Sequence, residues 1–227
     1  MPSQFEFLLL IAAIGFGMSS LIETTSWALR AMSNKSNQGL FNAKANIYLY
    51  GGRFFALFFM MILSLIVDKQ ADLYYVLMFI SISVSFAALL QLLYWHSNFF
   101  FLLINRIMIF LFLKKITNVN LLNIQNKKID KRLFINSWVA TLILVFGVTS
   151  PYLLAALYPN VRMTISTFGQ VINAIGTIIL LFKVDPILYQ RMDKNDLHIH
   201  VFSYIKGRYF GLMFASSILW ILFFIVT

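Results

Sequence analysis

The sequence predicts an all-α integral membrane protein, a bundle of about six transmembrane helices with an interfacial helix between the third and fourth spans. Of the 227 residues, 60% are hydrophobic and only 11% are charged, whereas charged residues make up about 25% of a typical soluble domain. Six stretches are also apolar over the roughly 20 residues that a bilayer core requires. The basic residues gather on alternate sides of these stretches, as expected for a chain that crosses a membrane repeatedly.

The six predicted spans cover residues 5–29, 45–67, 73–95, 134–157, 164–184 and 204–226. The first has neither the basic start nor the small-residue cleavage site of a signal peptide, so we expect it to be retained. Residues 98–113 are apolar but interrupted by Asn105 and Arg106. This pattern favours a helix in the membrane interface over a seventh span. The chain 1–227 is then expected to form one transmembrane domain.

The basic residues predict the orientation. All but Lys69 and Arg162 of the 18 Lys and Arg residues belong to the first, third and fifth connecting segments or to the adjoining helix ends. Positively charged loops stay in the cytoplasm, so both termini are expected on the outer side of a bacterial cytoplasmic membrane. The net charge of +10 then reflects orientation and attraction to anionic membrane lipids, and it requires no nucleic-acid partner.

Polar residues inside the first two spans are candidate functional residues, because charges in lipid are costly. At helical spacing, Glu23, Ser26 and Arg30 share one face of the first span. The second span carries Asn46 and Arg53, and Arg53 is expected at a depth similar to that of Glu23. Glu23 and Arg53 could form a structural salt bridge, or Arg53, oriented by Glu23, could bind an anionic headgroup. Arg30 alone is typical of a residue that extends to the interface.

The fifth span has a second polar face, with Gln170, Asn173 and Thr177 on the same side of the helix. Such amides can form hydrogen bonds between helices, or they can line a water-accessible cavity. Both interpretations stay open for Gln170 and Asn173. Gly169 and Gly176 permit close approach of another helix. In the last span, a row of small residues also predicts tight helix packing, including packing against a second subunit; this row is Gly207, Gly211 and Ala215.

Catalytic motifs are missing from the sequence. It contains no P-loop, no His-Glu-x-x-His and no Gly-x-Ser-x-Gly. There is no cysteine, and we interpret His198 and His200 as part of a solvated turn rather than as metal ligands. We therefore expect neither an enzyme nor a cofactor or metal site. An intramembrane enzyme acting on lipid phosphates would need Glu23 or the stretch from Asp185 to Asp196.

The first two spans resemble the Amj lipid II flippases, the alternate to MurJ. Residues 22–30 read Ile-Glu-Thr-Thr-Ser-Trp-Ala-Leu-Arg, which is similar to the family pattern Ile-Glu-Thr-x-Ser-aromatic-x-x-Arg. Asn46 and Arg53 keep the family's Asn and Arg spacing in the second helix, and Asp68 resembles its acidic end. The resemblance covers about the first 50 to 70 residues. Beyond them only the hydropathy plan is similar.

The resemblance implies translocation of lipid II, the undecaprenyl-pyrophosphate-linked peptidoglycan precursor, from the inner to the outer leaflet. It implies that Arg30 and Arg53 contact the pyrophosphate, and that Glu23 either orients Arg53 or couples the cycle to protons. The route for the sugar is expected to be lined by Asn46, Ser26, Gln170 and Asn173, the last two on helical spacing alone. Alternatives are another polyprenyl-linked oligosaccharide of O-antigen or capsule, or a scaffold of envelope synthesis that transports nothing. Because a chain of this size encloses little space, we expect a homodimer or a groove open to lipid.

Overall fold

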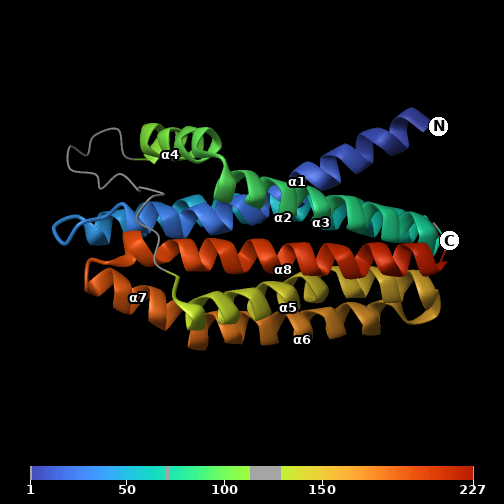
Figure 1. The fold of residues 1–227 in the computed structure, drawn as a ribbon. Coiled ribbons are helices and arrows are strands. Elements are labelled where there is room, and N and C mark those ends of the chain that lie inside the picture. The colour runs from blue at the N-terminus through green and yellow to red at the C-terminus, as the bar shows by residue number, and fades with distance from the viewer. Residues whose placement is uncertain (1, 70–71, 113–128, 227) are drawn as a thin grey trace.

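The computed structural model describes residues 2–69, 72–112 and 129–226 (Figure 1). Six helices in this part of the chain are long and apolar enough to cross a membrane, which confirms the all-α membrane fold. Five of them are α1 (Pro2–Ala31), α2 (Gln38–Asp68), α3 (Leu73–His96), α5 (Lys131–Leu157) and α8 (Leu197–Val226). The other begins within α6 (Arg162–Ile179) and continues to Asp193 at the end of α7 (Asp185–Asp193). A helix satisfies its own backbone hydrogen bonds, so lipid can surround it on all sides.

The short helix α4 (Asn98–Phe112) lies beside the bundle rather than within it (Figure 1). Its connection to α3 is a hydrogen bond of 3.0 Å from the Tyr94 hydroxyl to Asn105 Oδ1. Phe101 is fully buried and stacks against Tyr94. A separate helix between the third and fourth spans is therefore present, while its position relative to lipid stays a prediction. Residues 113–128, with most of the predicted basic loop, lie outside the described residues.

The six long helices form two triplets that are arranged alike. In the first triplet α1 packs on α2 and α3, and in the second α5 packs on α6 and α8. The third helices of the two triplets, α3 and α8, pack together and join them. The triplets run in opposite directions along the bundle, because α1 starts at the end where α5 finishes (Figure 1). Opposed triplets of this kind are common in membrane transporters.

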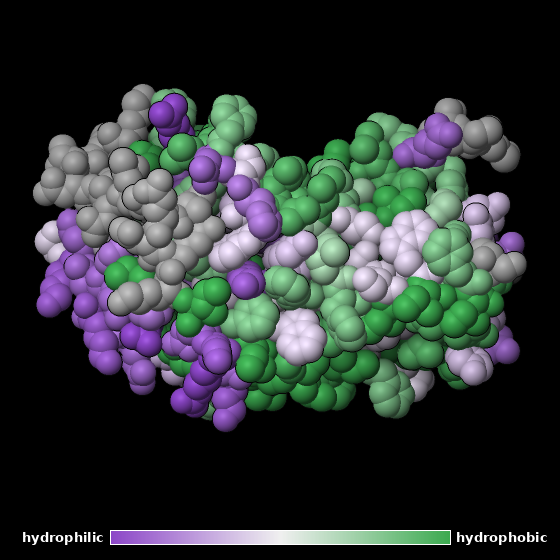
Figure 2. Space-filling view, viewed as in Figure 1, coloured by the Kyte–Doolittle hydropathy of each residue, from purple (hydrophilic) through white to green (hydrophobic). Residues whose placement is uncertain are grey.

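Both described chain ends lie at the same end of the bundle (Figure 1), which we call the terminal end. The opposite end holds residues 32–37, 129–130 and 194–196, and we call it the basic end. Figure 2 shows hydrophilic residues gathered at the basic end and a mostly hydrophobic surface over the middle. This distribution is the one that a multi-pass membrane protein requires, with the apolar belt against lipid.

The small residues of α8 pack inside the chain. A Cβ placed on Gly207 would lie 2.6 Å from the Phe134 carbonyl oxygen, and one on Gly211 would lie 2.9 Å from the Trp138 carbonyl oxygen. Both carbonyls belong to α5. The prediction of close helix packing is confirmed, but these glycines face α5 and are not available to a second subunit. The homodimer itself stays a prediction.

Helix α5 begins at a capping aspartate. The Asp130 carboxylate accepts hydrogen bonds from the Arg132 and Leu133 backbone N–H groups at 3.1 and 3.2 Å. It also accepts one from Arg191 of α7 (Asp185–Asp193) at 3.2 Å. Partial burial by itself raises the pKa of Asp130, but the Leu133 and Arg191 hydrogen bonds outweigh it and hold the pKa below its usual value.

Replacing Asp130 by alanine is expected to lower the free energy of unfolding by about 1 kcal/mol at neutral pH, because the cap is lost. The pKa is lower in the folded state, so this contribution is complete well above pH 4 and disappears as the pH falls below it. Thermal unfolding in detergent at about pH 7 and pH 3 measures the effect. Asp193→Ala, at an exposed position of α7, is the control and should match the wild type. An Asp130→Ala deficit that persists at the lower pH would contradict this explanation.

Candidate functional site

A cavity of about 440 Å³ lies inside the bundle toward the basic end, and we call it the inner cavity. Residues from both triplets line it, which places it between the two halves of the molecule. Its charged lining residues come from four helices: Glu23 of α1, Arg53 of α2, Asp185 of α7 and Arg208 of α8. Ser26 and Asn173, two further residues predicted from sequence, also line it. Glu23, Ser26, Arg53 and Asn173 therefore line one cavity, while their role in binding a substrate stays a prediction.

The Glu23 carboxylate pairs with Arg208, not with Arg53. Arg208 Nη2 donates to Glu23 Oε2 at 2.7 Å. The Arg208 side chain is 4% exposed and that of Glu23 is 33% exposed, so the carboxylate faces the cavity while the guanidinium is buried behind it. The predicted Glu23–Arg53 salt bridge is therefore wrong, because α8 packs against α1 and supplies the nearer cation.

Arg53 lies in the same cavity without an acidic partner. Its guanidinium stacks over the Tyr50 ring at 5.1 Å, and it forms no ion pair with any other described residue. Gly52 packs on Ile22, so the predicted common depth of Arg53 and Glu23 is correct. Arg53 is exposed, and it is consequently the cation of this cavity most available to an incoming anion.

Arg30 and Asn46 form a second polar group beside the cavity. Arg30 Nη2 donates to Asn46 Oδ1 at 2.7 Å, and Nη1 donates to Ser26 Oγ at 3.3 Å. The guanidinium also lies 4.5 Å from the Trp27 ring centroid. Arg30 is only 4% exposed, so the alternative of a residue extending to the interface is wrong. Arg30 and Asn46 tie α1 to α2 and are not among the residues that line the cavity, whereas Ser26 and Trp27 line it.

Asp185 reaches the cavity because the fifth span does not end where the sequence predicts. After α6, residues Leu180–Val184 form a π-helical turn that leads directly into α7. Turns of this kind widen a helix locally and are frequent at functional sites. Asp185 and Pro186 follow at once, and the proline has no N–H to donate to the preceding turn. The turn therefore leads into a half-buried carboxylate that lines the same cavity as Glu23 and Arg208.

Asn173 also lines a second cavity, and Gln170 lines that cavity alone. The close approach predicted for α6 is confirmed, because Gly169 and Gly176 face Pro151 and Leu144 of α5. Asn173 belongs to this packed face, because a Cβ on Gly147 of α5 would lie 3.2 Å from its Cβ, and it also lines both cavities. No hydrogen bond between the Asn173 amide and another helix is present among the described residues.

Two residues of the inner cavity were missed from sequence, Tyr204 and Arg208, and Asp185 was considered only for the alternative of an enzyme. Arg208 lies inside the predicted span 204–226, where any charge is a candidate functional residue. It was counted instead among the basic residues that set orientation. The signal that could have found it is its position one turn beyond the start of an otherwise apolar helix. Tyr204 lies one turn before it and its hydroxyl accepts from Arg208 Nη1 at 3.4 Å.

The fold and the inner cavity define a multi-pass α-helical membrane protein with a charged cavity between two opposed helix triplets. A family model described as Amj, Alternate to MurJ, matches residues 104–220, just over half of the chain. The chain belongs to this family, as its first two helices predicted. No curated protein and no solved structure matches the chain.

The matched region and the predicted signature lie in different parts of the chain. The signature residues Glu23, Arg30, Asn46 and Arg53 precede residue 104, whereas Arg208 lies within the match. The match therefore supports the family but not the individual roles that the resemblance implies for the first two helices. Those roles depend on the geometry of the cavity.

Proposed function

We propose that this protein is a lipid II flippase, which moves the undecaprenyl-pyrophosphate-linked peptidoglycan precursor from the inner to the outer leaflet of the bacterial cytoplasmic membrane. The observation that carries the proposal is the inner cavity, where the unpaired Arg53 and the Glu23–Arg208 pair lie between two opposed triplets. Membership of a family described as Alternate to MurJ supports the same activity.

The charges of the cavity suggest how an anionic headgroup is bound. When all four groups are ionised, the two positive charges of its arginines equal the two negative charges of its carboxylates. A pyrophosphate therefore binds strongly only if it replaces a carboxylate as the partner of an arginine. Arg53 binds the phosphates first, because no carboxylate of the described residues forms an ion pair with it. The phosphates then compete with Glu23 for Arg208, since a guanidinium binds phosphate and carboxylate oxygens with similar geometry.

This exchange of partners would couple binding to a conformational change. Glu23 belongs to the first triplet and Arg208 to the second, so their ion pair joins the two halves of the molecule. When the phosphates displace Glu23 from Arg208, this ion pair between the two triplets is broken while the headgroup stays bound. In opposed triplets, movement of one half against the other opens a central site alternately to each side.

The size of the cavity indicates which part of the cargo enters it. A volume of about 440 Å³ is in the range of small-molecule sites and accommodates the pyrophosphate with part of the glycan. The polyprenyl tail remains in lipid, and the remaining headgroup follows a groove open to its surroundings. The reaction forms and breaks no covalent bond, so the protein acts as a transporter rather than an enzyme. The basic end faces the cytoplasm and both termini face outward.

Complementation tests the proposal. In a bacterium depleted of its essential lipid II flippase, the wild-type protein is expected to restore growth and surface labelling of lipid II. Arg53→Gln is expected to lower the initial labelling rate about tenfold or more, because a hydrogen bond to a charged group contributes about 1.5–3 kcal/mol. Arg106→Gln, at an exposed arginine of α4, is the matched control and should behave as the wild type.

Each outcome has a definite meaning when membrane levels of the proteins are equal. If the wild-type protein gives no rescue and no labelling, the lipid II assignment is wrong, and the precursors of O-antigen or capsule become the next cargo to test. If the wild type rescues but Arg53→Gln does so equally well, the inner cavity is not the headgroup site.

A further inference from the structure

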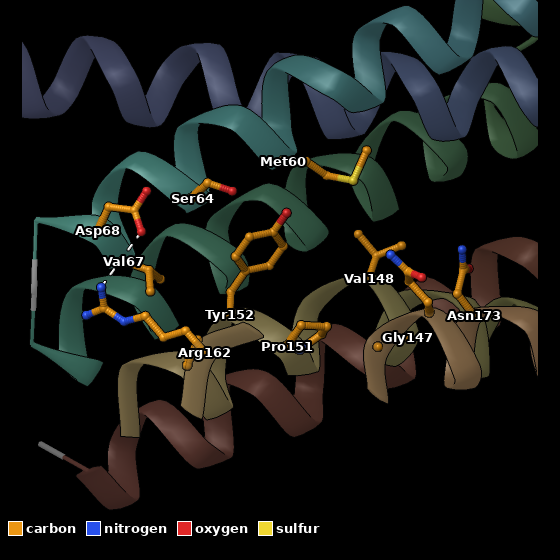
Figure 3. Close-up of a pocket in the computed structure, with 13 residues that line it drawn as sticks. Met60, Ser64, Val67, Asp68, Gly147, Val148, Pro151, Tyr152, Arg162 and Asn173 are labelled. Atoms are coloured by element: carbon orange, nitrogen blue, oxygen red, sulfur yellow. Dashed lines mark ion pairs between the residues drawn. The ribbon is translucent and has the colours of Figure 1, made fainter. Parts of the chain in front are cut away.

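A second cavity of about 350 Å³ lies toward the terminal end of the bundle, and we call it the outer cavity (Figure 3). Its lining comes from α2, α5 and α6. Met60, Val148 and Asn173 line both cavities, so the inner and outer cavities adjoin. Along α2, Arg53 and Ser64 are separated by about 16 Å at the rise of an α-helix. The two cavities therefore follow one another along α2.

The outer cavity has its own charged group. Asp68 at the end of α2 and Arg162 at the start of α6 form an ion pair of 3.7 Å across its mouth (Figure 3). This contact is longer than a charge-assisted hydrogen bond of about 2.7–2.9 Å. The Asp68 side chain is 74% exposed and that of Arg162 is 26% exposed, so the carboxylate is largely solvated while the guanidinium lines the cavity.

Arg162 also has unused hydrogen-bonding capacity. Its Nε atom is buried and has no hydrogen-bond partner among the described residues. A buried donor without a partner costs about 1–3 kcal/mol, which a bound acceptor would recover. The Gln170 and Asn173 amides lie on the same side of α6 and line the cavity. The cavity therefore offers one cation and two amides, a donor set suited to phosphate and sugar oxygens.

We propose that the outer cavity is a second binding site for the phosphate group of a polyprenyl phosphate or pyrophosphate, with Arg162 as its cation. This inference rests on the proposed function and adds a site on the release side of the same path. The cargo leaves Arg53 and Arg208 in the inner cavity, passes Asn173, and is received by Arg162 while Asp68 turns to solvent. The long ion pair permits this exchange, because an ion pair to a solvated carboxylate such as Asp68 contributes little free energy.

The absence of cysteine from the sequence provides a direct test by single-cysteine labelling. Ser64→Cys reports on the outer cavity and Ala56→Cys on the inner cavity, and both positions lie on α2. Each variant, purified and reconstituted in nanodiscs, is labelled with a polar maleimide in the presence of undecaprenyl pyrophosphate. With this lipid at about ten times its Kd, the labelling rate at either cysteine should fall about tenfold, since about one site in eleven is then empty.

Variants of the charged pair make the test specific. Arg162→Gln should abolish protection at Ser64→Cys and leave protection at Ala56→Cys intact, which also shows that the variant is folded. Lys69→Gln, at an exposed lysine of the same end, should change neither. Asp68→Asn removes the competing carboxylate and should lower the lipid concentration that protects Ser64→Cys.

The possible results separate this inference from the proposed function. Protection at the inner cysteine alone overturns the outer site and leaves the flippase proposal standing. Absence of protection at both cysteines counts against both proposals. Equal protection by the uncharged lipid undecaprenol, or protection at Ser64→Cys that survives Arg162→Gln, shows that the outer cavity holds the tail without recognising phosphate, and it overturns the inference.

Discussion

Replacing Glu23 by glutamine is expected to destabilise the protein more than replacing its partner Arg208 by glutamine. Arg208 is 4% exposed, whereas the Glu23 side chain is 33% exposed to the cavity. Glu23→Gln therefore leaves a buried guanidinium without a counter-charge, a change that costs about 3–5 kcal/mol in comparable buried pairs. Arg208→Gln leaves a carboxylate that water in the cavity can still solvate, so its cost is smaller. Unfolding in mixed micelles measures both.

The double variant Glu23→Gln/Arg208→Gln distinguishes a structural pair from a cargo site. Without either charge it should recover most of the stability that Glu23→Gln lost, because no uncompensated charge remains. Transport, measured by surface labelling of lipid II, should stay at least about tenfold below that of the wild type, since the phosphate has lost a cation. Recovery of transport together with stability would mean that the pair only holds α1 and α8 together.

Replacing Gly211 by leucine is expected to prevent the protein from accumulating in folded form. A Cβ at this position would lie 2.8 Å from Thr141 Cβ and 2.9 Å from the Trp138 carbonyl oxygen. The carbonyl is part of the α5 backbone and cannot move aside as a side chain can, so the two helices must separate. Because α8 also carries Arg208, the same displacement would remove this cation from the inner cavity. Detergent-resistant folding and membrane yield measure the effect.

Gly51→Leu is the matched control for this variant. A Cβ at Gly51 meets no atom within 4 Å, and the residue is exposed on α2, so leucine there should lie against lipid without harm. Gly211→Ala should be intermediate, because its single methyl group requires a smaller shift. If Gly211→Leu proved fully folded and active, the close packing of α5 and α8 would be dispensable.

The position of a polar site near Glu23 could be predicted from the sequence, but its charge pairing could not. Helical spacing places Glu23 and Ser26 on one face of α1, and both line the inner cavity. Spacing along one helix says nothing about which other helix approaches that face. Arg53 and Arg208 are both cations at helix positions of similar depth, and only the packing of α8 against α1 decides that Arg208 is the partner. The same limit applies to Asp185, which the π-helical turn brings into the cavity.

The sequence by itself determined the membrane fold, the number of long helices and the alternation of basic residues, because hydropathy and charge are local properties of each segment. It also determined which helices carry polar faces. Only the tertiary structure decided that the helices form two opposed triplets and that the glycines of α8 face α5. The tertiary structure likewise decided that an inner and an outer cavity adjoin. These features depend on contacts between residues distant in the chain, and no periodicity within one helix specifies its neighbour.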